Sequence, residues 1–277
     1  FVKVLIWDKA NTQSCGLLDL RGEVVVAPGE FSDLGVFSEG LCPAAVDVDS
    51  ENGRQRIWGY IDREGEWVIK PRFRKASEFH SGLAQVTIDD TKTTVTAYIN
   101  KNSEVQFEGN WSYASAFRGE LAWVRSDFGS GLPLKTMLIN RTGKVLQTLS
   151  DVRLFFNLSD ARACAITKDW TLLVYSKDGK PQSSVQGAFR YLQIDVQSIV
   201  DNCIPRNEEG QFGYSDLDGN WVIKPQYHKV QPFCGKYALV RKRVRDKSLW
   251  GVIDRSGKYV IEPSYSQATG LSTIKRN

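Results

Sequence analysis

The chain has 277 residues, of which 42% are hydrophobic and 25% charged, and its formal net charge is +4. This composition is ordinary for a globular protein, and it excludes a long disordered chain, a collagen-like chain and a bundle of membrane-spanning helices. The small positive charge also argues against a dedicated nucleic-acid-binding domain. With 8 Trp, 10 Tyr and 13 Phe against a single Met, the composition favours β-strands.

The predicted elements are short strands joined in hairpins. Residues 1–7, FVKVLIW, are predicted to form a strand, and residues 15–28, CGLLDLRGEVVVAP, to form the first hairpin. The second hairpin has the clearest sequence, WGYIDREGEWVIKPRF at residues 58–73. Its turn is predicted at residues 62–65, where an aspartate accepts hydrogen bonds from the turn backbone and a glycine adopts a positive φ. Pro71 has no backbone N–H and ends the second strand.

The same hairpin recurs at regular intervals along the chain. It is weaker at residues 97–107, 137–146 and 173–181, and clear at residues 212–227 and 250–265. One polar residue precedes each turn, at intervals of about 40 residues: Asp19, Asp62, Asn100, Asn140, Ser176, Asp216 and Asp254.

Between the hairpins, a Leu-Ala-x-Val strand follows an aromatic residue, as at residues 82–86 after Phe79. Residues 270–275 resemble the same strand. Each repeat is therefore predicted to be a four-stranded antiparallel meander, which contains a hairpin, a third strand around residues 72–76 and a Leu-Ala-x-Val strand.

Three hairpins share a template that carries a family resemblance. It reads aromatic-Gly-x-x-Asp-x-x-Gly-x-aromatic-Val-Ile-x-Pro-x-aromatic. The structural motif residues are Trp58, Gly59, Asp62, Gly65, Asp216, Gly219, Trp250, Gly251, Asp254 and Gly257. The template resembles the bacterial WG repeat family over nearly the whole chain, clearly in the second, sixth and seventh repeats and weakly in the third to fifth. The resemblance implies a scaffold of repeats without a catalytic motif.

A four-stranded repeat of about 40 residues cannot bury both its faces alone and must stack on its neighbours. We therefore expect one all-β WG-repeat domain over residues 1–277, folded as a β-propeller-like ring of about seven small antiparallel blades. In such a ring, residues 1–7 would add a strand to the last blade and seal it. An open β-repeat solenoid is the alternative.

The sequence shows no catalytic or metal-binding arrangement. It lacks a Gly-x-Ser-x-Gly motif, and His80 and His228 fall near predicted third strands. We expect no enzyme activity, no metal and no cofactor. The five cysteines lack the spacing of zinc ligands, and most are expected to be buried. Cys164 and Cys203 are the candidate disulfide, provided that they lie on neighbouring strands.

Candidate partner-binding residues lie in two parts of the chain. The basic run of residues 241–247 is expected in a loop or at a strand end, where it would meet an acidic partner. Its candidate residues are Arg241, Lys242, Arg243 and Arg245. In the weaker middle repeats, loops and aromatic residues on a rigid scaffold are typical of interfaces. The candidates there are Asp89, Asp90, Trp123 and Phe128.

We interpret the chain as a non-enzymatic protein-binding scaffold, and more specifically as a bacterial immunity or inhibitor protein that binds a cognate toxin or effector. One alternative is a carbohydrate-binding, small-ligand-binding or hydrolytic propeller that uses its central pocket. Another is anion or nucleic-acid binding through residues 241–247. Because the chain starts at Phe1 and not at Met, we expect a processed or trimmed product, located in the bacterial periplasm or envelope after loss of a leader, or in the cytoplasm.

Overall fold

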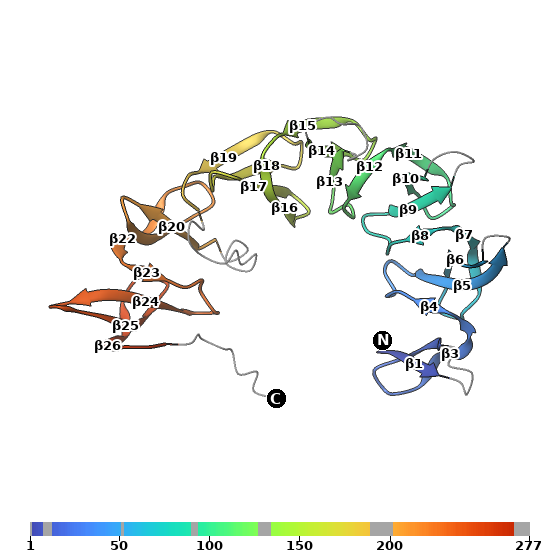
Figure 1. The fold of residues 1–277 in the computed structure, drawn as a ribbon, viewed down its shortest axis with the longest axis horizontal. Helices are drawn as coiled ribbons and strands as arrows, with labels where there is room; N and C mark the ends of the chain where they lie inside the picture. The colour runs from blue at the N-terminus through green and yellow to red at the C-terminus, as the bar shows by residue number, and fades with distance from the viewer. Residues whose placement is uncertain are drawn as a thin grey trace. The chain divides into compact units, whose positions relative to one another are not determined.

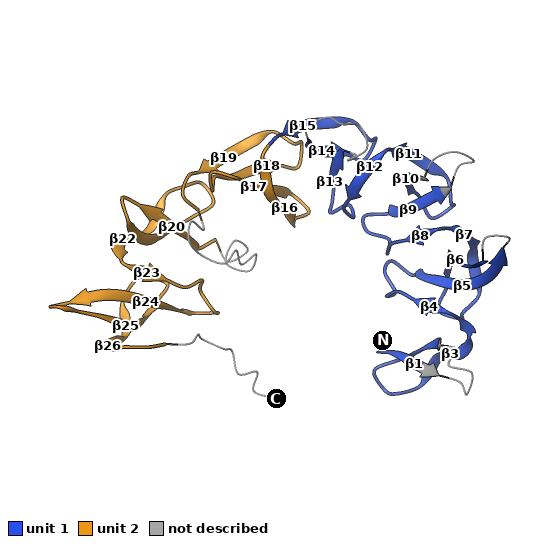
Figure 2. Cartoon of the chain, in the orientation of Figure 1, with its two compact units in different colours: residues 1–150 blue, residues 151–277 orange. Residues whose placement is uncertain are grey.

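The computed structural model describes residues 2–7, 13–50, 53–89, 94–126, 134–188 and 202–268. All the regular elements in these segments are β-strands. Within the same segments, no helix has the length and apolar character needed to cross a membrane. The chain divides into two compact units, Phe1–Ser150 and Asp151–Asn277, which are coloured separately in Figure 2.

The first unit contains four small antiparallel sheets in chain order (Figure 1). The first sheet is β1 (Val2–Trp7), β2 (Gln13–Leu18) and β3 (Val24–Phe31). The second is β4 (Asp33–Leu34), β5 (Cys42–Ser50), β6 (Gly53–Ile61) and β7 (Trp67–Phe73). The third is β8 (Lys75–Ala76), β9 (Ala84–Asp89), β10 (Thr94–Ile99) and β11 (Val105–Gly109). The fourth is β12 (Trp111–Ala114), β13 (Leu121–Ser126), β14 (Thr136–Asn140) and β15 (Val145–Leu149).

The second unit contains three sheets of the same kind. The fifth sheet is β16 (Val152–Ser159), β17 (Arg162–Thr167), β18 (Leu172–Ser176) and β19 (Pro181–Val185). The sixth is β20 (Ile204–Glu208), β21 (Gln211–Ser215) and β22 (Trp221–Tyr227). The seventh is β23 (Lys229–Val230), β24 (Tyr237–Val244), β25 (Lys247–Asp254) and β26 (Tyr259–Tyr265). The described fold is all-β and β-propeller-like, because each sheet is a small meander of consecutive antiparallel strands.

The sheets begin at a different point of the repeat from the one predicted. Each Leu-Ala-x-Val strand pairs with the hairpin that follows it, as β9 does with β10 and β24 with β25. The short strand before it belongs to the same sheet, since β8 pairs with β9. The N-terminal strand β1 accordingly pairs with β2, and the seventh sheet takes its four strands from residues 229–265. The expectation that residues 1–7 complete the last sheet is therefore wrong.

Each hairpin turn is held by the polar residue that precedes it. Asp62 Oδ1 accepts hydrogen bonds from the backbone N–H of Glu64 at 3.1 Å and of Glu66 at 2.9 Å. Gly65 closes this turn with a φ of 85°. The same pair of bonds recurs at Asp19, Asn100, Asn140, Asp216 and Asp254. Because the carboxylate or amide oxygen satisfies two backbone donors that the hairpin leaves open, this residue has a structural role.

The glycine of the Trp-Gly pair makes room for an irregular partner strand. Between the pairs Trp58↔Phe73 and Tyr60↔Ile69, β7 contains two more residues than β6, so it bulges toward Gly59. A Cβ atom on Gly59 would overlap the Ile69 carbonyl oxygen and lie 2.8 Å from the Pro71 nitrogen. Only glycine therefore fits at this position without a shift of β7.

The hydrophobic cores lie between successive sheets of each unit. One core cluster combines Tyr60, Ile69 and Phe73 of the second sheet with residues from the third-sheet segment, among them Phe79. The rings of Tyr60 and Phe79 have centroids 4.8 Å apart. The Tyr60 hydroxyl also donates a hydrogen bond to the Ser77 carbonyl at 2.8 Å. This one side chain thus joins two sheets by ring packing and by a hydrogen bond.

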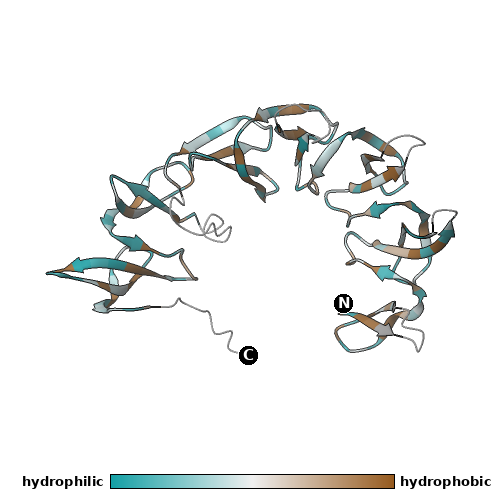
Figure 3. Ribbon diagram, in the orientation of Figure 1, coloured by the Kyte–Doolittle hydropathy of each residue, from teal (hydrophilic) through white to brown (hydrophobic). Residues whose placement is uncertain are grey.

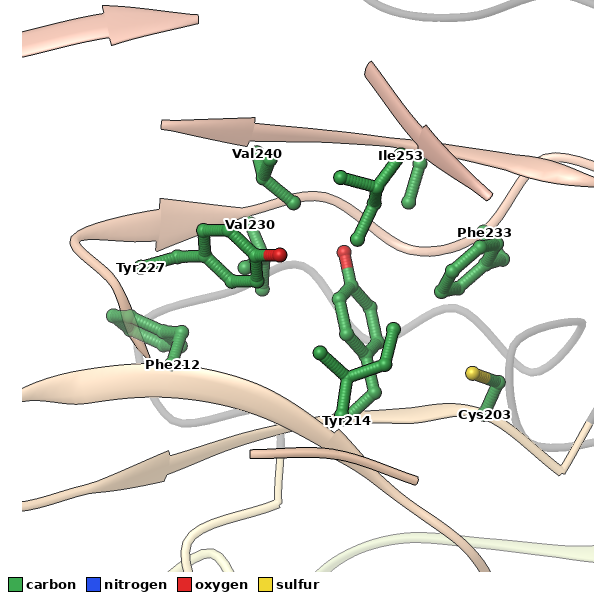
Figure 4. Packing of buried hydrophobic residues seen from close by; sticks show 10 residues of the cluster. Cys203, Phe212, Tyr214, Tyr227, Val230, Phe233, Val240 and Ile253 are labelled. Carbon is green, nitrogen blue, oxygen red and sulfur yellow. The ribbon is translucent and has the colours of Figure 1, made fainter. Parts of the chain in front are cut away.

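The same junction recurs in both units. Tyr98 packs on Phe117 with centroids 5.0 Å apart, and Tyr214 packs on Phe233 at 4.8 Å. Figure 4 shows Tyr214 among the buried residues of the sixth and seventh sheets, with Phe233 beside its ring. Its hydroxyl donates to the Gln231 carbonyl at 2.7 Å. At these three junctions, the aromatic residue before the Leu-Ala-x-Val strand packs its sheet against the tyrosine of the sheet before it.

We expect Gly59→Ala to lower the free energy of unfolding by about 2 kcal/mol, because the bulge of β7 must move away from the new methyl group. Ala97→Gly is the matched control, since Ala97 occupies the same position of the third hairpin and pairs directly with Glu108. That control should lose about 1 kcal/mol through backbone entropy and about 0.8 kcal/mol more with the buried methyl group of Ala97. Urea denaturation measures both changes, and a neutral or stabilising Gly59→Ala would contradict the close approach.

Burial raises the pKa of Tyr60, Tyr98 and Tyr214 above the ordinary value for tyrosine. The stability linked to these hydroxyls is complete below the unfolded-state pKa, about 10, and falls as the pH rises above it. Each buried tyrosine should reduce the free energy of unfolding by about 1.4 kcal/mol per pH unit in that alkaline range.

The Tyr60→Phe variant isolates one of these contributions. At neutral pH it should lose about 1 kcal/mol with the hydrogen bond to Ser77. Above pH 10 its free energy of unfolding should fall less steeply than that of the parent chain, by about 1.4 kcal/mol per pH unit. Urea denaturation at several pH values, with tyrosinate absorbance recorded in parallel, measures the two slopes. Equal slopes would show that the Tyr60 hydroxyl ionises in the folded protein.

Candidate partner-binding surfaces

The predicted basic run forms the outer part of the β24–β25 hairpin. The two strands pair without interruption from Tyr237↔Asp254 to Val244↔Lys247, so the turn contains only Arg245 and Asp246. Figure 3 shows that most of the hairpin is hydrophilic.

Two of the four predicted cations in this hairpin are held by neighbouring strands. The Arg241 Nε donates to the Ser248 carbonyl at 3.3 Å, and its guanidinium lies 5.9 Å from the centre of the Trp250 ring. The Lys242 Nζ donates to Gln226 Oε1 at 3.3 Å. Both side chains are only partly exposed. The hairpin and β22 hold these two side chains in place, so they are less available to a partner than the cations at the tip.

The other two cations lie at the exposed tip. Arg243 and Arg245 are exposed, as is Lys247 on the opposite strand. Val244 between them keeps 40% of its surface exposed, which leaves an apolar side chain among the cations. Arg245 has a φ of 54°, a left-handed conformation that glycine adopts more easily. This surface can attract an acidic partner and offer it a small apolar contact.

The candidates from the middle repeats do not form a described surface. Trp123 is fully buried in β13, so the prediction that its side chain contacts a partner is wrong. Its strand is one of the two inner strands of the fourth sheet, and residues 121–124 of that strand are all buried. Asp89 ends β9, but its side chain is outside the described part of the structure. Asp90 and Phe128 also lie outside the described residues.

The candidate disulfide is not present. Cys164, on β17, packs with Ile166 and Ile204 in the core between the fifth and sixth sheets. Cys203 precedes Ile204 and packs in the next core, against Tyr214. Neighbouring residues of an extended chain point to opposite sides, so Ile204 and not Cys203 faces Cys164. Among the described residues, no group of three or more His, Cys, Asp or Glu side chains is placed to hold a metal ion.

Sequence reasoning missed a second basic surface, in the first unit. A cleft of about 580 Å³ lies beside β6 and β7, where the chain passes from the second sheet to the third. Its basic lining residues are Arg54, Arg56, Arg72, Arg74 and Lys75. The signal in the sequence is the alternation Arg54-x-Arg56 and Arg72-x-Arg74, because alternate residues of a strand share a face.

The family of the chain follows from its repeats. The model of the WG containing repeat matches residues 16–47, 58–91, 212–243 and 250–272. Four of the seven repeats of the chain therefore match the WG repeat family. These matches include the four glycines that face a bulged strand, Gly16, Gly59, Gly213 and Gly251. The third to fifth hairpins lie outside the four matched regions.

No curated protein matches this chain. Among solved structures, it is similar to a eukaryotic initiation factor at 11% identity, with a TM-score of 0.43 and coverage of 95% of this chain and 88% of the other. The β-propeller domain of the Trilobed protease from Pyrococcus furiosus is 13% identical, with a TM-score of 0.42 and coverage of 96% and 94%. The WD40 β-propeller domain of Doa1 is 12% identical, with a TM-score of 0.34 and coverage of 86% and 85%.

Thiol reactivity can test which cysteines are buried and whether Cys164 and Cys203 form a disulfide. Burial raises the pKa of Cys42 and Cys164 to about 12, whereas Cys234 is partly exposed. Because the thiolate is the reactive form, we expect Cys234 to react first with a thiol reagent in the native protein, and all five cysteines to react after unfolding. Cys234→Ser should remove the fast phase. A bridge between Cys164 and Cys203 would leave only three reactive thiols in the unfolded, unreduced chain.

Proposed function

We propose that this chain is a non-enzymatic protein-binding scaffold, and that the tip of the β24–β25 hairpin contacts an acidic surface of its partner. The observation that carries the proposal is the exposure of Arg243, Arg245 and Lys247 around Val244. Charged residues of this kind at an interface mainly accelerate association and select the partner, while apolar contacts slow dissociation.

The use of the repeat motif supports the scaffold role. Asp62 and its equivalents bind their own turns, Gly59 accommodates a bulge, and Tyr60 joins two sheets. These residues make the contacts that stabilise the fold. Partner binding is therefore expected at residues outside the motif, at strand ends and hairpin tips. Surfaces of this kind carry binding in rigid repeat scaffolds.

The partner in this proposal is a toxin or effector that the chain neutralises, as an immunity protein does. A rigid scaffold suits this task because little conformational entropy is lost when a pre-organised surface binds. The basic tip predicts that the bound face of the partner is acidic. A binding protein with another kind of partner would use the same surface, so the identity of the retained protein decides between them.

The experiment is affinity capture with the immobilised chain from a lysate of its native source, at low and at high salt, with retained proteins identified by mass spectrometry. We expect one stoichiometric protein, and at least tenfold weaker binding to the variant Arg243→Ala with Arg245→Gly. The glycine fits the left-handed turn, so this variant should keep its fold. Lys177→Ala with Lys180→Ala, two exposed cations of another hairpin, is the charge-matched control. Equal binding by both variants would overturn the role of the tip.

A further inference from the structure

The basic cleft of the first unit has more positive than negative charge in its wall. Arg56 Nε lies 2.9 Å from Asp47, and Arg56 also pairs with Asp33 at 3.4 Å. Arg54 lies 3.5 Å from the same Asp47. The hydrogen bond from Arg56 lowers the pKa of Asp47, which keeps this carboxylate ionised. Two carboxylates therefore face the arginines of β6, whereas the cleft contains five cationic side chains.

The side of the cleft formed by β7 and β8 contributes three of the five cations, Arg72, Arg74 and Lys75. Arg72 donates hydrogen bonds to the Ser103 carbonyl at 2.8 Å and the Ser103 hydroxyl at 2.6 Å. These partners are neutral, so they orient the guanidinium without cancelling its charge. The guanidinium also lies 5.0 Å from the centre of the Phe73 ring, a cation–π contact. Lys75 is exposed at the start of the third sheet.

The spacing of the cations matches an extended chain. Arg54 and Arg56 are two residues apart on β6, and Arg72 and Arg74 are two residues apart at the end of β7. Alternate residues of a strand lie about 6.6–6.8 Å apart. That distance is larger than a single phosphate group spans, but it is the repeat of alternate side chains in another extended peptide. The volume of about 580 Å³ accommodates several side chains.

We propose that this cleft binds an acidic peptide segment in extended conformation, with Asp or Glu at alternate positions facing the arginines of β6 and β7 and a further acidic residue facing Lys75. Arginine presents a planar fork of donors that suits carboxylates. This assignment rests on the proposed function, because the segment belongs to a protein partner. It adds a second contact site, separate in sequence from the β24–β25 hairpin.

The test uses the full chain and three labelled synthetic peptides in a fluorescence anisotropy titration. One peptide alternates Glu with Thr, one has the same composition with all Glu residues contiguous, and one replaces every Glu by Gln. We expect the alternating peptide to bind at least fivefold more tightly than the contiguous one, and the Gln peptide not to bind. Equal affinity for the two acidic peptides would overturn the extended register.

The variants locate the binding and separate the two proposals. Lys75→Glu reverses one exposed charge and should weaken binding of the alternating peptide at least tenfold, and Arg72→Gln should weaken it as well. Arg243→Ala with Arg245→Gly should leave peptide binding unchanged. An unchanged affinity of Lys75→Glu for the alternating peptide would overturn the proposal that the cleft binds it, even where the hairpin proposal stands. Loss of peptide binding only in the hairpin variant would instead assign peptide binding to the tip. Full displacement by inorganic phosphate at a concentration equal to that of the peptide would show a general anion site instead.

Discussion

Burial of one sheet against the next is the interaction on which the rest of this fold depends. A small antiparallel sheet has two faces and too few strands to bury either by itself. Strand β10, an inner strand of the third sheet, shows how the chain solves this problem. Its alternation sends Ala97 and Ile99 into the core shared with the second sheet, and Tyr98 into the core shared with the fourth. Strand β6 likewise contributes Tyr60 to one core and Ile61 to another, so the second and third sheets are each packed on both faces.

This arrangement determines where binding residues can lie. The inner strands of a sheet are buried, and Trp123 on β13 is buried with them although it falls in a region of varied sequence. Charge is carried instead on hairpins that extend beyond the core. The β5–β6 and β24–β25 hairpins have the longest continuous pairings of the described strands, nine and eight residue pairs. Arg54 and Arg56 lie on one of them, and Arg243 on the other.

The local features of the fold were predictable from the sequence, and its longer-range features were not. The turn aspartates act within one hairpin, so their spacing predicts their structure. The expectation that Pro71 ends its strand is wrong, because β7 continues through Pro71 to Phe73, and the proline lies in the bulge. The start of each sheet depends on whether the Leu-Ala-x-Val strand pairs with the hairpin before it or with the hairpin after it. The two hairpins are about equally far from this strand in the sequence, so the spacing does not decide between them. The cleft depends on the approach of Arg54 to Lys75, which are in different sheets. Alternation predicts that Arg54 and Arg56 share a face, but not what lies opposite.

The repeats also show which features of the motif depend on one another. Each of the four glycines that face a bulge has a proline twelve residues later, at positions 28, 71, 225 and 263. The weaker hairpins have Ala97, Met137 and Leu173 at the glycine position, and none has that proline. Their side chains are accepted because each pairs directly with the partner strand, as Met137 does with Thr148. Trp-Gly and Ile-x-Pro are therefore two halves of one bulge that can be lost together, whereas the turn acceptor and the contact between sheets remain, because without them neither the hairpin nor its core would form.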